Sequence, residues 1–447
     1  MASAAEQLAS NLNFAAFSKA TDLKKRIWFT LGALIVYRLG TYIPMPGINP
    51  DELARAFAQQ STGILGLFNM FAGGAVGRMA IFALGIMPYI SASIIIQLMT
   101  SVVPSLEALK KEGEQGRKVI NQYTRYGTVI LATVQAYGIS AGLETQGSIV
   151  VDPGLFFRIS SVITLVGGTM FLMWLGEQIT ARGIGNGISL IIFTGIVANL
   201  PAALAQLLEL GRTGALSTTV ILLVMVVAVV CIAGIVFFER AQRRLLIQYP
   251  KRQVGNRMFQ GDTSHLPLKL NTAGVIPPIF ASSLLLLPVT IANFTDTTQL
   301  PGWASAIITA LGHGQPLYMA LYALMIGFFA FFYTAVVFNP KETADNLKKH
   351  GGFIPGIRPG ERTAEYIDYV LTRITVVGAI YLVIICLLPE FLISAVGIPF
   401  YLGGTSLLIV VSVTMDTVAQ VQGHLLAHQY EGLVKKAKLR GGRRGGR

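Results

Sequence analysis

The chain has 447 residues, of which 53% are hydrophobic and only 13% are charged, and its net charge at neutral pH is +13. A soluble globular protein carries about twice that charged fraction, so the composition excludes a soluble domain and indicates a polytopic membrane protein. The two cysteines, Cys231 and Cys386, both lie in apolar runs, which predicts no disulfide framework. Residues 1–20 lack the apolar core of a cleaved signal peptide, so we expect the first span to direct insertion.

Ten apolar runs are long enough to cross a bilayer as helices. They lie near residues 27–45, 79–100, 124–143, 155–177, 184–205, 216–238, 271–293, 316–338, 370–389 and 401–423. Because the number is even, both ends of the chain are expected on one side of the membrane.

The basic residues predict which side that is. The N-terminal segment, the even-numbered connections and the tail together hold 28 Lys and Arg, whereas the opposite connections hold only Arg55, Arg78 and Arg212. Since cytoplasmic loops carry the excess of Lys and Arg, both termini are predicted to be cytoplasmic.

A short apolar helix is predicted at 63–71, directly before the second span and separated from it by glycines. It is too short to cross the membrane, and irregular backbone at membrane depth is tolerated only where protein buries it or water lines it. The arrangement therefore suggests a cavity, a gate or a plug. An amphipathic helix in the membrane interface explains the pattern equally well.

Charges within the spans are sparse and lie toward span ends, which disfavours an ion-coupled carrier. The chain has no phosphate-binding loop motif and no metal-ligand spacing, so we expect no cofactor, no metal and no enzymatic activity. Ile86 and Ile90 are one helical turn apart, as are Ile188 and Ile192. Such pairs are most often ordinary packing, but branched apolar rings can also seal a pore. A small-solute transporter that uses the broken helix as its site stays open as the alternative to a passive channel.

Two cytoplasmic connections of about 30 residues are longer and more basic than topology requires. These are residues 239–270 and 339–369. A soluble partner, an RNA-bearing surface or anionic lipid headgroups would each complement their charge.

Several motifs together resemble the SecY family, the central subunits of the bacterial protein-conducting channel. They are IFALGIMPYISAS (81–93), QYTRYG (122–127), WLGEQIT (174–180), RGIGNG (182–187), HLPLK (265–269), FNP (338–340), ETADNLKK (342–349), FIPGIRPG (353–360) and PFYLGGTS (399–406). The resemblance covers nearly the whole chain in order. The segment NRMFQGD (256–262) and the Arg/Gly tail depart from the family pattern.

The resemblance implies an all-α polytopic fold with ten transmembrane helices in two pseudo-symmetric five-helix halves around a central pore. It implies a pore ring of Ile86, Ile90, Ile188, Ile192, Ile279 and Ile409. It implies a half-inserted plug helix that includes Ile64, Leu65, Leu67, Phe68, Met70 and Phe71. Spans two and seven would form a lateral gate, with polar residues Ser91, Gln135 and Asn271.

The resemblance also implies a channel that passes unfolded secretory proteins and releases hydrophobic segments sideways into lipid. Its expected partners are the small subunits SecE and SecG, the motor ATPase SecA or a ribosome, signal sequences, preproteins and anionic lipids. The expected docking residues for the motor or ribosome are Arg243, Arg244, Lys251, Arg252, Arg257, Lys348, Lys349 and Arg358. The expected location is the bacterial inner membrane.

These expectations divide the chain into eight parts. They are a cytoplasmic N-terminal segment (1–26), the first five-helix half with the plug near 63–72 (27–205), an exterior loop with the sixth span (206–238), a cytoplasmic loop (239–270), spans seven and eight (271–338), a second cytoplasmic loop (339–369), spans nine and ten (370–423) and a basic tail (424–447).

Overall fold

The structure is a computed structural model that describes residues 21–60, 69, 72–145, 149–214, 216–249, 252–254, 257–259, 263–293, 315–396 and 403–441. Its helices are α3 (Thr21–Gly40), α4 (Pro50–Gln60), α6 (Met87–Val102), α7 (Pro104–Lys111), α8 (Glu114–Thr145), α9 (Leu155–Arg182), α10 (Gly187–Arg212), α11 (Thr218–Arg240), α12 (Ile276–Asn293), α14 (Pro316–Val337), α15 (Pro340–Lys349), α16 (Glu361–Val396) and α17 (Gly404–Gly441). Its strands are β1 (Gln242–Gln248), β2 (Arg252–Val254), β3 (Arg257–Phe259) and β4 (Thr263–Lys269).

Each of the ten predicted spans overlaps one helix of this structure, with different bounds. Within the described residues, six helical stretches are long and apolar enough to cross a membrane on their own. They are Leu155–Arg182, Gly187–Arg212, Thr218–Arg240, Pro316–Lys349, Glu361–Leu392 and Gly404–Ala427. A seventh is possible if α6 and α7, which meet at an angle of 97°, count as one broken span. The multi-pass helical architecture predicted from composition is therefore present.

The second predicted span is wrong over its first eight residues. The prediction was one continuous run from residue 79, but residues 72–86 form successive turns and α6 begins only at Met87. Gly85 has φ +57°, a left-handed conformation that favours glycine over other residues and interrupts a helix. Pro88 then lies in the first turn of α6, where its missing N–H costs no hydrogen bond.

Protein buries this turn segment, as irregular backbone at membrane depth requires. Ala75 and Ala80 are fully buried. Two backbone hydrogen bonds attach the segment to the chain that follows α3: the Met45 N–H donates to the Met79 carbonyl at 2.9 Å, and the Ile81 N–H donates to the Ile43 carbonyl at 3.0 Å.

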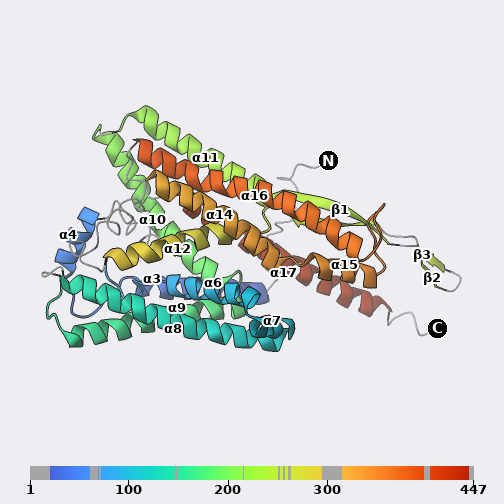
Figure 1. Cartoon of the computed structure of the whole chain (residues 1–447), viewed down its shortest axis with the longest axis horizontal. Helices are drawn as coiled ribbons and strands as arrows, with labels where there is room; N and C mark the ends of the chain where they lie inside the picture. Colours follow the sequence, from blue (N-terminus) through green and yellow to red (C-terminus); the bar gives the residue numbers. More distant parts are fainter. Residues whose placement is uncertain are drawn as a thin grey trace.

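The long helices form two groups that follow chain order (Figure 1). The first comprises α3, α6, α8, α9 and α10, and the second comprises α11, α12, α14, α16 and α17. The groups meet where α6 packs on α12, where α10 packs on α17 and α11, and where α3 touches α17. One large apolar cluster contains residues of both groups, so the core is continuous between them.

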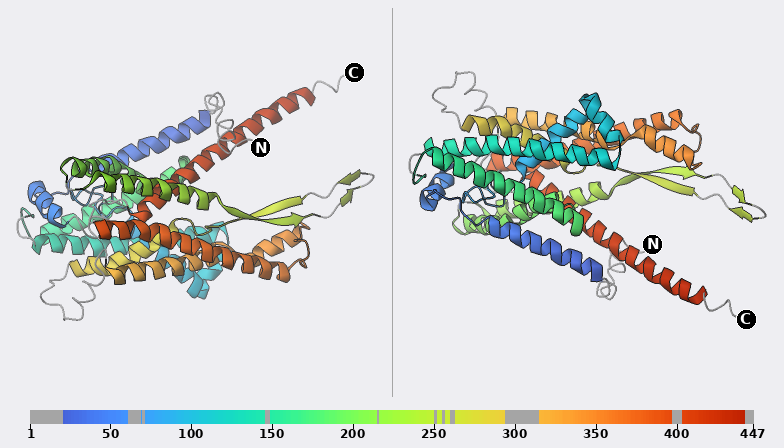
Figure 2. Two further views of the ribbon diagram at one scale, coloured as in Figure 1. Left: turned by 90° about the horizontal axis from the view of Figure 1, so that it is seen from above. Right: turned by 90° about the horizontal axis from the view of Figure 1, so that it is seen from below.

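The connection at residues 239–270 contains strands that the sequence analysis did not predict. β1 and β4 pair antiparallel, with Leu245 opposite Leu266 and Ile247 opposite Ser264. The resulting hairpin extends toward the same end as α15 and the C-terminal end of α17, and the short strand pair β2–β3 at its tip reaches beyond the helices (Figure 2). Leu245 and Ile247 are buried while Leu246 between them is exposed, which is the alternation of a strand with one packed face.

Candidate functional site

The six isoleucines of the predicted pore ring lie on or directly before four helices, and all belong to the largest apolar cluster or pack against it. Four of them are buried members of that cluster: Ile86, Ile90, Ile192 and Ile409. The other two, Ile188 and Ile279, are partly buried and pack against it. Because α6 and α10 belong to the first helix group and α12 and α17 to the second, the cluster lies where the two groups join. This placement is compatible with an apolar seal, and the pore-ring role stays a prediction.

Local structure positions several members of this cluster. Ile86 immediately precedes α6 and follows Gly85, and its carbonyl accepts from the Ile90 N–H at 3.1 Å. At the start of α10, the Asn186 side chain caps the helix by accepting from the backbone N–H of Ile188 at 3.1 Å. Two of the predicted isoleucines therefore lie at helix N-termini, where the backbone is fixed by a turn and a cap.

A hydrogen bond links the same helix start to the other group. The Gly185 N–H donates to Oε1 of Gln420 on α17 at 2.8 Å. The glycine-rich turn before α10 is thus used for close helix packing, because a Cβ at Gly187 would collide with the Gly176 carbonyl of α9. This agrees with the packing role that the sequence favoured over phosphate binding.

The three predicted gate residues are placed on neighbouring elements, but no hydrogen bond joins them within the described part of the chain. Ser91 is buried on α6, which packs against both α8 and α12. Gln135 lies on α8, and its buried Oε1 has no hydrogen-bond partner among the described residues. Asn271 precedes α12 and is buried. These three polar side chains therefore lie in one region of the fold, and their role in a lateral gate remains a prediction.

Asn271 has a partner that the sequence analysis missed. Its Nδ2 donates to Oε1 of Glu239 at 2.7 Å and to the Gly274 carbonyl at 3.1 Å. Glu239 is the second-last residue of α11, beside Arg240, so in the sequence it is indistinguishable from an ordinary charge at a span end. Only the fold brings it to Asn271, 32 positions away.

Two ion pairs join charges that lie near span ends. Arg125 of α8 makes a bidentate contact with Glu177 of α9, with Nη2–Oε2 at 2.7 Å and Nε–Oε1 at 3.1 Å. At the opposite end of the same helix pair, Arg158 contacts Glu144 at 2.6 Å. Paired charges of this kind join helices and leave no carboxylate free for ion coupling at these positions.

The predicted plug residues cannot be located. Residues 64, 65, 67, 68, 70 and 71 lie outside the described part of the chain. Asn69 is described, and it accepts two hydrogen bonds from the turns that follow: its carbonyl from the Gly74 N–H at 2.7 Å and its Oδ1 from the Gly77 N–H at 2.8 Å.

The predicted docking residues lie on the hairpin and on the connection between α15 and α16. Arg243 and Arg244 are exposed on β1, and Lys348 and Lys349 are exposed in the last turn of α15. Arg252 and Arg257 belong to the strand pair β2–β3, and Lys251 lies outside the described residues.

The hairpin and the second connection form a single body. Gln248 and Phe353 exchange both backbone hydrogen bonds, at 2.9 and 3.0 Å. Behind this bridge is a small apolar cluster whose buried members are Leu245, Leu268, Ile354, Ile367, Val370 and Ile374. Two connections far apart in sequence are therefore packed together, and both carry exposed basic residues.

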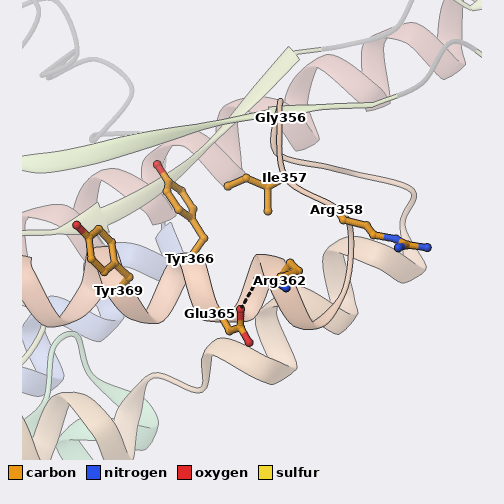
Figure 3. A pocket seen from close by; sticks show the side chains of 7 residues that line it. All are labelled: Gly356, Ile357, Arg358, Arg362, Glu365, Tyr366 and Tyr369. Atoms are coloured by element: carbon orange, nitrogen blue, oxygen red, sulfur yellow. Dashed lines mark ion pairs between the residues drawn. The ribbon is translucent and has the colours of Figure 1, made fainter.

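Arg358 lies at a pocket in the second connection, with a volume of about 380 Å³. The lining residues are Gly356, Ile357, Arg358, Arg362, Glu365, Tyr366 and Tyr369 (Figure 3). The Arg358 carbonyl accepts from the Thr363 hydroxyl at 3.0 Å, which attaches the turn to α16. Figure 3 shows the Arg358 side chain directed away from the ion pair of Arg362 and Glu365, whose atoms are 3.7 Å apart. Arg358 is exposed, and within the described residues it has no carboxylate partner.

The described residues contain no cluster of His, Cys, Asp and Glu that could hold a metal ion. The notable features are instead an apolar cluster between two helix groups and a basic surface at one end. Together they define a class: a multi-pass helical membrane protein whose two helix groups share an apolar core, with exposed basic residues at one end.

Comparison with known proteins gives the family. The SecY family model matches residues 80–418. The chain is 58% identical to the protein translocase subunit SecY of Escherichia coli over 424 residues, covering 94% of this chain and 96% of that one. It is 56% identical to the subunit of Rickettsia conorii over 430 residues, covering 95% and 99%. The chain belongs to the SecY family, whose members are channel subunits of the protein translocase rather than enzymes.

Solved structures agree on the fold. The structure superposes on a protein-conducting channel with a TM-score of 0.66 at 17% identity, covering 91% of this chain and 93% of that one. Sec61 in a canine ribosome-channel complex gives a TM-score of 0.64 at 16% identity, with the same coverage. The predicted fold class, a helical polytopic channel, is confirmed.

Proposed function

We propose that this chain lines the path by which unfolded secretory proteins cross the bacterial inner membrane, with both termini in the cytoplasm. The observation that supports the proposal is that isoleucines from both helix groups belong to, or pack against, the apolar cluster shared by the two groups. An apolar constriction adapts to any side chain that passes and excludes water and ions when empty.

Sideways release of hydrophobic segments follows from the packing of α6 on α12. These two helices come from different groups, so they can separate without breaking either group. A signal sequence of apolar character then partitions between the opening and lipid. Ser91 lies on α6, and Asn271 lies in the segment directly before α12.

The driving energy is supplied from outside the chain, by a motor ATPase such as SecA or by a translating ribosome. The joined hairpin and second connection, with Arg243, Arg244, Lys348, Lys349 and Arg358, offer a basic surface to such a partner. The canine relative is a ribosome-channel complex, which supports the ribosome as one partner. SecE and SecG are proposed as the small subunits, and anionic lipid headgroups as a further ligand of the basic connections.

The test is reconstitution of the purified chain with its small subunits and motor in vesicles. We expect ATP-dependent protection of a secretory preprotein from added protease. Uptake of small solutes without preprotein transport would instead favour the secondary transporter. The same vesicles carrying a stalled secretory chain should give a cross-link to α6.

A further inference from the structure

Two arginines of α3 and the turn segment converge on one backbone carbonyl. Nη1 of Arg38 donates to the Gly73 carbonyl at 2.8 Å, and Nη2 of Arg78 approaches the same oxygen at 3.4 Å. Nε of Arg78 also donates to the Thr41 carbonyl at 3.3 Å, at the end of α3. Gly73 is thus tied to α3 through both guanidinium groups.

An aromatic ring organises the pair. The guanidinium of Arg78 lies 4.1 Å from the ring centroid of Tyr42, and that of Arg38 lies 5.4 Å from it. Nη2 of Arg38 also donates to the Tyr42 hydroxyl at 3.2 Å. Within the described residues, neither arginine forms an ion pair with a carboxylate. Two like charges held this closely repel each other. The hydrogen bonds to the Gly73 carbonyl and the contacts with the Tyr42 ring offset this repulsion.

Gly73 itself is tightly enclosed. It has φ +66°, and a Cβ there would lie 2.8 Å from the Tyr37 hydroxyl and 3.2 Å from the Gly195 Cα of α10. The residue is therefore fixed between α3 and α10, at the beginning of the buried turns that lead to Ile86. Since the turns of residues 72–86 contain no regular hydrogen-bond ladder, their position depends on attachments of this kind.

We propose that Arg38 and Arg78 are positioning residues of the resting channel, which bind the Gly73 carbonyl and so hold residues 72–86, and Ile86 with them, in the sealed arrangement. The proposal rests on the proposed function, because it assigns the arginines an effect on the seal. Charge-assisted hydrogen bonds are about twice as strong as neutral ones, so two arginines suit a segment that must stay closed without regular secondary structure.

The test uses the full chain with Arg38→Gln, Arg78→Gln and the double variant. Arg55→Gln is the matched control, because Arg55 is an exterior cation that pairs with Glu52 and does not touch the turns. We expect Arg38→Gln to raise the resting ion leak of reconstituted vesicles roughly tenfold and to increase transport of preproteins with defective signal sequences. The ion leak of the double variant should be only slightly higher than that of the stronger single variant. It should stay well below the product of the two single effects, because both arginines bind the same oxygen. Arg38→Lys should restore part of the seal.

A second readout is independent of transport. Ala72 is buried, so a cysteine introduced there should resist a maleimide reagent in the parent and react in the Arg38→Gln background. Unchanged labelling overturns the positioning role of the two arginines, whatever the channel carries. The role is also overturned if the variants, at normal protein amounts, show the ion leak and the signal-sequence discrimination of the parent. Loss of insertion, or a fall in thermal stability with no change in labelling or leak, would make the arginines merely structural and also overturns it. If labelling changes but the parent transports no preprotein, the proposed function fails, while the positioning role of the two arginines is retained.

Discussion

At the residue scale, the proposed seal includes two buried isoleucines, one directly before α6 and one on α10. Ile86 and Ile192 are each 4% exposed. Replacing both with Asn would place amide groups where only apolar atoms lie, and water would follow to satisfy them. We expect a hydrated constriction, a several-fold higher ion leak and weaker discrimination against defective signal sequences. Conductance of reconstituted vesicles and export of signal-sequence mutants measure the two effects.

The control is the double Leu variant at the same positions, which keeps the apolar character and nearly the volume. It should leave both measurements close to the parent. If the Asn pair leaves leak and stringency unchanged while the protein is present in normal amounts, the two isoleucines are ordinary core residues.

Arg358 is a second prediction at this scale. It is an exposed cation on a turn that contains Pro355 and Pro359, and exposed charges contribute only about 0–1 kcal/mol to stability. We expect Arg358→Glu to insert normally and to lose nearly all motor-driven export, because the charge presented to the partner is reversed. Arg358→Lys should recover only part of the activity if the partner needs the planar guanidinium.

Lys341→Glu provides the matched change of charge in the same connection, and we expect near-normal export from it. Equal losses at both positions would show that only the total charge of the surface matters. Disappearance of the Arg358→Glu protein from the membrane would make Arg358 structural.

At the element scale, apolar runs predicted the long helices, because length and hydropathy alone decide whether a segment can span. They did not predict that residues 79–86 are turns, because the break depends on backbone conformations such as φ +57° at Gly85 and φ +43° at Met79. An equally apolar segment can be helix or buried turn, and hydropathy does not distinguish them. The pore ring was predicted from family resemblance and stays a prediction, whereas the bond between Glu239 and Asn271 arises only from tertiary contact.

The hairpin was missed for a related reason. Its strands pair across a gap of more than a dozen residues, and its packed face is completed by Ile354 from another connection. Strand stability of this kind lies in cross-strand and tertiary contacts rather than in the local sequence.

Joining of the two connections can be tested by a disulfide. Gln248 and Phe353 exchange both backbone hydrogen bonds, which places their Cα atoms about 5.5 Å apart, within the range a disulfide spans. We expect Gln248→Cys with Phe353→Cys to cross-link rapidly under mild oxidant, as seen by a mobility shift after a protease cut between them. Arg244→Cys with Phe353→Cys is the control, because four residues along a strand separate the thiols by about 13 Å. Equal cross-linking of both pairs would mean that the hairpin moves freely.

Removal of residues 64–70 tests the predicted plug, which lies outside the described residues. No helix of either group is touched, so we expect the topology to survive and the resting ion conductance to rise. Conductance is measured in planar bilayers beside the parent. Failure to insert would assign this stretch to the structural core, and unchanged conductance would favour an interfacial helix.

At the scale of the whole molecule, orientation is the property on which every docking and transport assignment depends. The basic surface formed by the hairpin and the second connection is useful to a motor or ribosome only if it faces the cytoplasm. The 28 Lys and Arg on that side, against three on the other, predict that it does. This orientation can be tested at α11, because that single helix lies between the end of α10 in the first group and the start of the hairpin.

α11 has 23 residues, which extend about 34 Å as a helix and suffice to cross the hydrocarbon core once. Arg212 at the end of α10 and Arg243 on β1 therefore belong to opposite sides. We expect a membrane-impermeant maleimide to label Arg243→Cys only in inverted vesicles and Arg212→Cys only in right-side-out ones. The native thiols of Cys231 and Cys386 are buried, at 5% and 1% exposure, so the parent chain is an unlabelled control. Labelling of both positions from one side would mean that α11 does not span, and the reverse pattern would place the basic surface outside, where no cytoplasmic motor or ribosome reaches it.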